Sequence, residues 1–108
     1  MTSRSSRVDD EPHALGFDRL IHEPARLVLM SNLYVVEEAD FVFLARQTGL
    51  TAGNISSHMA RLDDAGYVDV DKGFVGKRPR TTYRLTEAGR NAFERYRQHV
   101  GALLADTP

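Results

Sequence analysis

The sequence has 108 residues, 42% of them hydrophobic and 27% charged, with a formal net charge of −1 at pH 7. These values are typical of one globular domain that folds without a metal or a disulfide. The chain has no cysteine, which excludes disulfides, thiolate zinc sites and cysteine nucleophiles, and no apolar run approaches the roughly 20 residues of a membrane span.

The charge is unevenly distributed. Residues 1–50 hold five Lys or Arg and eight Asp or Glu, whereas residues 51–97 hold nine and six. Because a partner responds to the local field rather than to the total charge, the near-neutral sum does not exclude nucleic acid. The start "MTSRSSRVDD" has no apolar segment behind it and is not a secretory signal. We therefore expect a cytoplasmic protein.

The N-terminal part predicts a tail followed by helices. Residues 1–12 are polar and predict a disordered tail, so we assign the folded domain to residues 13–106. Residues 14–22 predict a short helical turn or two. Pro24 suits the first position of a helix, which continues with apolar residues at helical spacing: Leu27, Met30, Leu33 and Tyr34. The following "VVEEAD" predicts a connection.

Two further helices follow. Asp40 is placed to cap a helix over residues 40–49, and Gly49 to end it. Thr51 is placed to cap a third helix that runs to Gly66, with an apolar stripe of Ile55, Met59 and Leu62. The four-residue link "TGLT" between the two helices predicts a helix-turn-helix.

The pattern then changes from helical to alternating. Residues 67–72 and 81–85 predict two strands, joined by a link of about eight residues that holds Gly73, Gly76 and Pro79. A last helix begins at Thr86 and Glu87 and continues to about residue 105. The order is therefore three helices, a β-hairpin and a helix.

The third helix presents small and polar residues opposite its apolar stripe. At 100° per residue, its exposed N-terminal half consists of Gly53, Asn54, Ser56, Ser57, Ala60 and Arg61. Small residues allow close approach to a groove floor, Ser and Asn bond base edges, and Arg binds guanine or phosphate. The alternative is an ordinary solvated face, which would carry mixed Glu and Lys residues. We interpret this helix as a DNA-recognition helix.

The hairpin link gathers positive charge. Lys77, Arg78 and Arg80 lie near its tip, and no acid occurs between residues 72 and 86. Such a tip matches the phosphates of a duplex or a minor groove. A loop whose charges only maintain solubility would carry both signs. A helix-turn-helix followed by a basic hairpin is the winged-helix arrangement.

Two stretches, "GLTAGNISSHMARLDDAGYV" and "GKRPRTTYRLTEAGR", resemble the winged-helix domain of small bacterial transcriptional regulators near the MarR and ArsR families. The resemblance covers roughly residues 14–105. It implies an α+β winged helix with a three-helix core, a two-stranded wing and a long C-terminal dimerisation helix. It also implies a homodimer that regulates transcription at a near-palindromic DNA operator. It implicates, as DNA-binding residues, Thr51, Asn54, Ser56, Ser57, Arg61, Lys77, Arg78 and Arg80.

The last helix is the expected partner surface. One side of it carries Phe93, Tyr96, Val100, Leu103 and Leu104, more apolar residues than a terminal helix needs on so small a body. A two-fold dimer would set two recognition helices about 34 Å apart. The alternative is that this side packs only on its own domain.

Other functions are less well supported. No hydrolase, zinc-protease or nucleotide-binding motif occurs, so we predict neither an enzyme nor a metal or other cofactor. His58 is interpreted as a packing or phosphate-contact residue, and His22 and His99 as residues that can meet between protomers. Two alternatives stay open: a winged helix that binds an acidic protein, and a DNA-binding sensor of a metal or small ligand.

Overall fold

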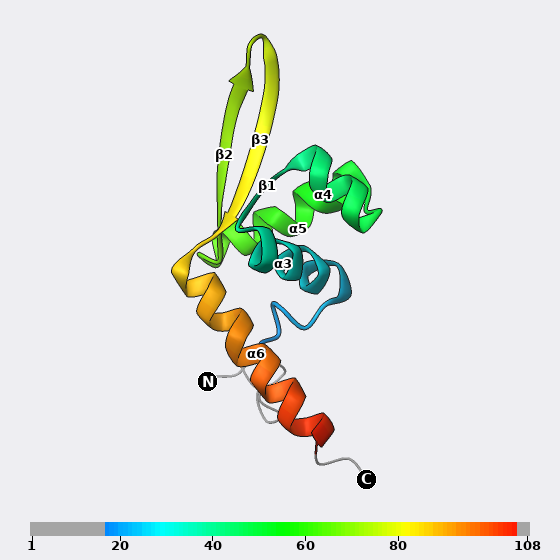
Figure 1. The fold of residues 1–108 in the computed structure, drawn as a ribbon, viewed down its shortest axis with the longest axis vertical. Coiled ribbons are helices and arrows are strands. Elements are labelled where there is room, and N and C mark those ends of the chain that lie inside the picture. The colour runs from blue at the N-terminus through cyan, green and yellow to red at the C-terminus, as the bar shows by residue number, and fades with distance from the viewer. Residues whose placement is uncertain (1–16, 106–108) are drawn as a thin grey trace, which may run out of the picture.

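The computed structural model describes residues 17–105. Along the chain these residues form α3 (Pro24–Val36), β1 (Glu38–Asp40), α4 (Phe41–Thr48), α5 (Ala52–Asp64), β2 (Val68–Val75), β3 (Arg78–Leu85) and α6 (Glu87–Ala105). The described part thus has four helices and a three-stranded antiparallel sheet, with the hairpin projecting at one end and α6 at the other (Figure 1). The predicted α+β winged helix is confirmed. The predicted tail, residues 1–12, lies outside the described residues, as do residues 13–16 and 106 of the predicted domain.

Helix boundaries follow local capping, largely as predicted. The Asp40 carboxylate accepts a bond of 2.8 Å from the Phe43 N–H and begins α4. The Thr51 hydroxyl accepts one of 3.2 Å from the Asn54 N–H and begins α5. Gly49 ends α4 with a φ of 73°, a conformation that glycine adopts without strain.

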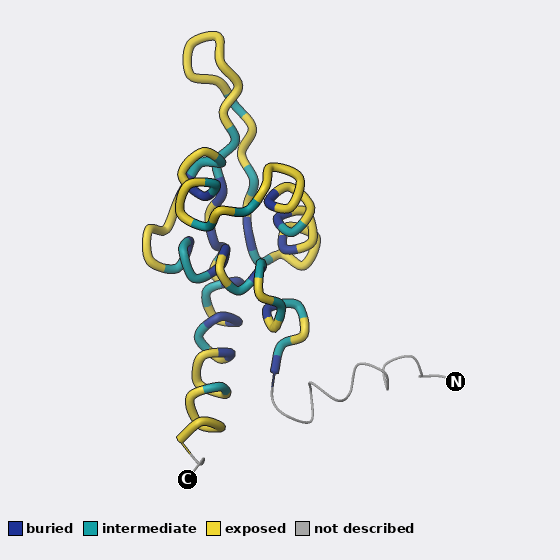
Figure 2. The backbone as a smooth tube through the Cα atoms, turned by 90° about the vertical axis from the view of Figure 1, so that its right-hand side faces the viewer, coloured by how far each residue is buried: buried dark blue, intermediate teal, exposed yellow. Residues whose placement is uncertain are grey.

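The core lies where α3, α4 and α5 meet the base of the sheet and the first half of α6. Figure 2 shows buried residues in the middle of the molecule, whereas the hairpin tip and the C-terminal end of α6 are exposed. The predicted stripe of α5 is buried. The largest fully buried side chains are Ile21, Leu29, Met30, Leu33, Leu44, Ile55, Met59, Leu62 and Val68.

The prediction of a plain connection at "VVEEAD" is wrong. α3 continues to Val36, Glu37 turns the chain with a φ of 72°, and β1 then joins the sheet beside β3. Ala39 of β1 lies opposite Tyr83 and is buried. Three residues that include two acids carry no strand pattern, so pairing with β3 makes this segment a strand.

The hairpin is longer than predicted and its link is shorter. β2 and β3 extend to Val75 and Arg78 and are joined by the two residues Gly76 and Lys77, with Gly76 at a φ of 64°. Two-residue turns with positive φ match the natural twist of paired strands. Pro79 is accommodated in β3 because β1 pairs only with residues 82–84, which leaves that side of Pro79 unpaired.

The segment before α3 forms a hydrogen-bonded turn and no continuous helix. Within the described residues 17–23 the chain forms turns, because the Asp18 carboxylate accepts bonds from the N–H groups of Leu20 and Ile21, at 2.8 and 3.3 Å. Asp residues favour such local turns over helix interiors. One turn of the predicted kind is present, since the His22 N–H donates a bond of 2.8 Å to the Asp18 carbonyl, but it does not continue as a helix. Residues 14–16 of the prediction lie outside the described part.

Tyr67 joins this segment to the sheet. Its hydroxyl donates a bond of 2.5 Å to the Asp18 carboxylate. Burial, and then this bond to an acceptor, raise the pKa of Tyr67 to about 12 from an ordinary value of 10.0. The folded chain therefore holds the phenol proton more tightly than the unfolded chain.

We expect Tyr67→Phe to reduce the alkaline sensitivity of the fold. In the unmodified chain, the contribution of Tyr67 to the free energy of unfolding is fully present below about pH 10 and is lost as the pH rises through 12. Tyr67→Phe lacks this titration and should lose about 1 kcal/mol of stability at neutral pH, since the Asp18 bond is removed. Urea unfolding of both proteins from pH 7 to pH 11 checks this. Parallel stability profiles of the two proteins would contradict it.

Candidate nucleic-acid interface

All the predicted DNA-binding residues of α5 and its cap are exposed. Their side chains face away from the buried stripe of Ile55, Met59 and Leu62. The exposed set comprises Thr51, Gly53, Asn54, Ser56, Ser57 and Arg61. No acid occurs between Thr51 and Arg61, and Asp63 and Asp64 stand only at the C-terminal end of α5. The surface is therefore small, polar and without negative charge over its first two turns.

Gly53 on this surface has no packing explanation. A methyl group added there would meet no heavy atom within 4 Å, and the backbone does not adopt a positive φ. Glycine has a lower helix propensity than alanine, and Gly53 lies in the first turn of α5. A residue that weakens the helix, in open space, is consistent with close approach of another molecule.

The exposed side of α5 is continuous with the base of the hairpin. Ser56 and Ala60 from α5 line one groove of about 300 Å³ together with Val70 and Lys72 from β2. The predicted helix surface and the hairpin thus share a boundary. They do not lie on opposite sides of the molecule.

Strand alternation gives the hairpin two faces. The α5-side face, as we name it, continues the buried face of the sheet and consists of Val68, Val70, Lys72, Phe74, Pro79, Thr81, Tyr83 and Leu85. The outer face carries Asp69, Asp71, Gly73, Val75, Arg78, Arg80, Thr82 and Arg84. Two of the three predicted cations, Arg78 and Arg80, are therefore on the outer face, together with Arg84. The sequence did not reveal this because the predicted loop had no register.

Two arginines of the outer face already have carboxylate partners. Arg80 Nε lies 3.2 Å from an Asp40 oxygen, and Arg84 Nη2 lies 2.9 Å from a Glu38 oxygen. The pKa of Asp40 lies below its ordinary value, first because of the Phe43 N–H and then because of Arg80, although burial opposes both. Exposed pairs of this kind contribute little stability, but they orient the side chains.

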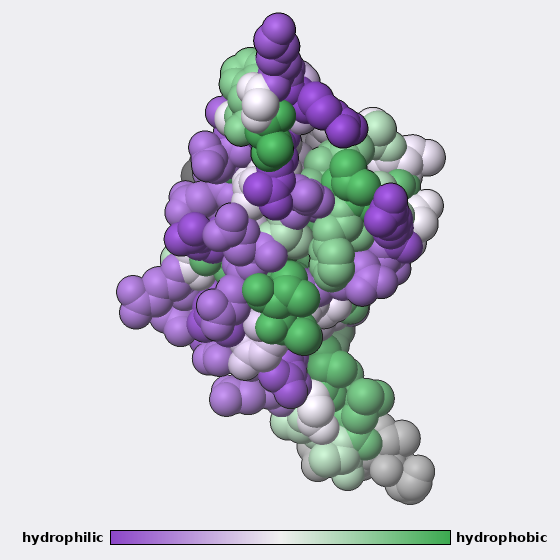
Figure 3. Space-filling view, turned by 45° about the horizontal axis from the view of Figure 1, so that its top comes forward, coloured by the Kyte–Doolittle hydropathy of each residue, from purple (hydrophilic) through white to green (hydrophobic). Residues whose placement is uncertain are grey.

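The hairpin tip keeps unpaired positive charge. Lys77 in the turn and Arg78 beside it are exposed, and within residues 17–105 their side chains form no ion pair. Hydrophilic side chains extend from this end of the molecule next to apolar surface (Figure 3). The cations available to an anionic partner are therefore those of the tip rather than the whole predicted cluster.

The predicted partner surface on α6 divides into two parts. Phe93 and Tyr96 are 5% and 6% exposed and belong to the core of their own chain. Tyr96 also shares a hydrogen bond of 2.7 Å with His22 Nδ1. Val100 is half-buried, and only Leu103 and Leu104 are exposed, at 46% and 64%. The two aromatic residues are thus used by the domain itself, because residues 17–22 and α3 pack against them.

His58 serves the interior flank of α5. Its Nδ1 lies 3.2 Å from Nη1 of the buried Arg26 and 4.0 Å from an oxygen of Glu23. Arg26 in turn donates a bond of 2.6 Å to the Leu20 carbonyl. His58 therefore helps to join α5 to the start of α3, which agrees with the packing interpretation of this residue.

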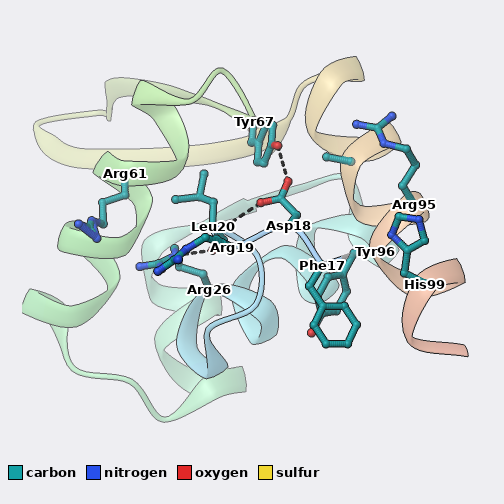
Figure 4. A pocket seen from close by; sticks show the side chains of 11 residues that line it. Phe17, Asp18, Arg19, Leu20, Arg26, Arg61, Tyr67, Arg95, Tyr96 and His99 are labelled. Atoms are coloured by element: carbon teal, nitrogen blue, oxygen red, sulfur yellow. Dashed lines mark hydrogen bonds between the residues drawn. The ribbon is translucent and has the colours of Figure 1, made fainter. Parts of the chain in front are cut away.

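A cavity of about 810 Å³ lies between residues 17–20, α5 and α6. Arg61 of α5 and Arg95 of α6 stand on opposite sides of it, with Asp18 and Tyr67 between them (Figure 4). Its remaining charged or polar lining residues are Arg19, Arg26, Tyr96 and His99. Arg61 thus borders both the exposed surface of α5 and this cavity. The described residues, this cavity included, contain no group of three or more His, Asp or Glu that could hold a metal ion.

Comparisons with known proteins agree with this geometry. A family model described as a winged helix DNA-binding domain matches residues 25–104. An uncharacterized protein of Methanocaldococcus jannaschii is 30% identical over 78 residues, which cover 72% of this chain and 85% of that protein.

Solved structures have the same fold. The transcriptional regulator homologue protein from Pyrococcus horikoshii OT3 is similar with a TM-score of 0.79 and 27% identity, covering 89% of this chain and 95% of the other. The transcriptional repressor BigR from Xylella fastidiosa is similar in fold, with a TM-score of 0.60, 22% identity and coverage of 95% and 94%. The sequence resemblance to winged-helix regulators near the MarR family is confirmed.

Proposed function

The chain belongs to the family of winged helix DNA-binding domains, and from this premise we propose that it is a sequence-specific transcriptional regulator that binds double-stranded DNA as a homodimer. One observation carries the proposal: the small, polar surface of α5, which is free of acids from Thr51 to Arg61, borders the hairpin whose tip holds unpaired cations. Its family and fold match transcriptional regulators, not enzymes.

α5 is the element that enters the major groove. Gly53 and Ser57 let the helix axis approach the groove floor, and Asn54, Ser56 and Arg61 supply donors and acceptors for base edges. The N-terminus of α5 at Thr51 adds N–H groups and a positive dipole beside a phosphate. Asp63 and Asp64 stand at the C-terminal end of α5, where the helix leaves the groove.

The hairpin binds beside this site as a wing. Lys77 and Arg78 contact backbone phosphates or the adjacent minor groove. Arg80 joins them by exchanging Asp40 for a phosphate, since its ion pair is partly exposed to solvent. Because that exchange costs the existing pair, we expect Arg80 to contribute less than Arg78.

Alanine substitutions of Arg61 and Arg78 should weaken DNA binding in different ways. We expect Arg61→Ala to weaken binding by about 1–3 kcal/mol and to relax one base preference, since this side chain reads a base edge. Arg78→Ala should weaken binding to all DNA sequences equally. It should also reduce the slope of log K against log salt by about one, because one phosphate contact is lost. Titration of selected and random labelled duplexes at two salt concentrations measures both effects.

The same titration separates the proposal from its rival. If Arg61→Ala lowers affinity equally for selected and random DNA, base readout by this residue is excluded. If the unmodified protein binds no duplex at low salt, the alternative of a winged helix that recognises an acidic protein is favoured instead.

Dimerisation rests on the C-terminal end of α6. Leu103 and Leu104 are exposed apolar side chains on a helix that extends past the body of the domain (Figure 1). A second copy that covers them would set two recognition helices on a near-palindromic operator. Sedimentation equilibrium should then give twice the chain mass of 12.1 kDa.

An effector is the second candidate feature, favoured by the cavity between α5 and α6. Arginines surround it, and Arg61 borders the DNA-facing surface. An organic anion bound there would therefore change the position of Arg61 on the recognition helix α5. Melting curves with a panel of aromatic acids and metal ions test this.

No helix in the described residues is long and apolar enough to cross a membrane. We place the protein in the cytoplasm, with the DNA that it binds.

A further inference from the structure

The tip of the hairpin exposes apolar side chains that the domain does not use. Phe74 is 72% exposed and Val75 is 58% exposed, although both stand in a regular strand. Apolar surface gathers at this end of the molecule beside hydrophilic side chains (Figure 3). An exposed apolar patch with a polar rim is typical of a contact with another molecule.

The strand register gives these two residues different directions. Phe74 lies opposite Pro79 on the α5-side face, whereas Val75 lies opposite Arg78 on the outer face. Val70, two positions before Lys72 on the α5-side face, already lines the groove shared with Ser56. Phe74 stands four residues farther, about 13 Å along the strand. It therefore extends the surface of the recognition helix outward.

The charges around Phe74 identify its partner as DNA. Lys77 and Arg78 stand at the tip, Lys72 lies two residues before Phe74 on the same face, and no acid occurs between residues 72 and 86. Such a rim matches the phosphates of a duplex and repels a second copy of the same tip. Phenylalanine and proline are residue types that proteins insert into the minor groove, where they contact sugars and part the stacked bases.

We propose that Phe74, with Pro79 opposite it, is an apolar wedge that enters the minor groove of the bound duplex beside the site read by α5. This inference rests on the DNA-binding function proposed above. Lys77 and Arg78 hold the phosphates on either side, while Phe74 contacts the sugar walls. The wedge favours steps that unstack easily, such as pyrimidine–purine steps, so the wing adds sequence preference without a hydrogen bond to a base.

Phe74→Ala tests the wedge, with Val75→Ala as the matched control. The probe is a duplex selected from random sequence by binding to the unmodified protein. Phe74→Ala should lower affinity roughly tenfold and leave the salt slope unchanged, since no cation is removed. Val75→Ala should stay within about twofold of the unmodified protein, because its short side chain is on the face opposite Phe74 and, unlike Arg78, carries no charge for a phosphate. Both variants should keep their melting temperature.

A fluorescent reporter tests insertion directly. The chain contains no tryptophan, so Phe74→Trp and Val75→Trp each introduce a single reporter. On addition of the selected duplex, the emission of Phe74→Trp should be quenched and protected from acrylamide, and that of Val75→Trp should remain accessible.

The outcomes separate the wedge from the function on which it rests. If the unmodified protein selects no duplex, DNA binding itself fails. If it binds and Phe74→Ala binds equally well, or Phe74→Trp stays accessible in the complex, only the wedge is excluded. If Phe74→Ala changes sedimentation while duplex affinity is kept, the patch is a contact between copies of the chain, and the wedge is again excluded.

Discussion

Gly89→Ala should destabilise the folded protein by about 3 kcal/mol or more, the largest loss expected from an alanine substitution at any of the described glycines. A Cβ at this position would lie 2.0 Å from the carbonyl oxygen of Tyr67 and 2.8 Å from its carbonyl carbon. Both atoms belong to the backbone, so no side-chain rotation relieves the overlap. α6 would have to move away from the turn that leads into β2.

That movement would break a small network at the start of α6. The Thr86 hydroxyl donates a bond of 2.6 Å to the Gly66 carbonyl and accepts one of 2.9 Å from the Gly89 N–H. The Thr86 N–H donates a bond of 3.0 Å to the Tyr67 carbonyl. Displacement of α6 would also withdraw Phe93 from the core. We expect the melting temperature to fall by more than about 10 °C, measured by circular dichroism.

Gly101→Ala is the control for this change. It is the same substitution in the same helix, but a Cβ there would meet no heavy atom within 4 Å. Alanine has the higher helix propensity, so Gly101→Ala should gain about 0.5–1 kcal/mol. Equal stabilities of the Gly89→Ala and Gly101→Ala proteins would show that α6 is not docked against Tyr67 in the way described.

Ser57→Glu should reduce duplex binding at least about a hundredfold without harming the fold. Ser57 is exposed on α5 in the surface proposed to enter the major groove. A carboxylate there would face phosphates and base acceptors, and would lose its water without a partner. Glutamate favours helices at least as well as serine, so the melting temperature should not fall.

Two controls assign this loss to the position rather than to the added charge. Ser57→Ala removes only a hydroxyl group and should cost less than about tenfold in affinity. Gln98→Glu adds the same charge on the exposed side of α6 and should change binding little, since salt screens distant charges. Equal losses for Ser57→Glu and Gln98→Glu would show that net charge, and not contact with α5, governs binding.

The sequence alone determined the features that depend on neighbours a few residues apart. Asp40 and Thr51 cap their helices, Gly49 ends α4, and Ile55, Met59 and Leu62 are buried as one stripe. Such features arise from hydrogen bonds within one turn and from the helical period. The exposed surface of α5 could be predicted for the same reason, because the inward stripe leaves only one direction for its serines.

Contacts between distant parts of the chain became visible only in the folded structure. Asp40 meets Arg80 across 40 residues and Glu38 meets Arg84 across 46. Arg80, one of the predicted DNA-binding cations, therefore has a partner within the domain. β1 becomes a strand only by pairing with β3, and the register between β2 and β3 places Phe74, rather than Arg80, on the α5-side face. In the sequence, Phe93 and Tyr96 fit a dimer interface as well as a core. Apolar periodicity shows that one face of a helix is covered, but it does not show which element covers it. The sequence around Gly89 does not indicate its close approach to Tyr67, because glycine occurs both at open positions and where two backbone segments touch.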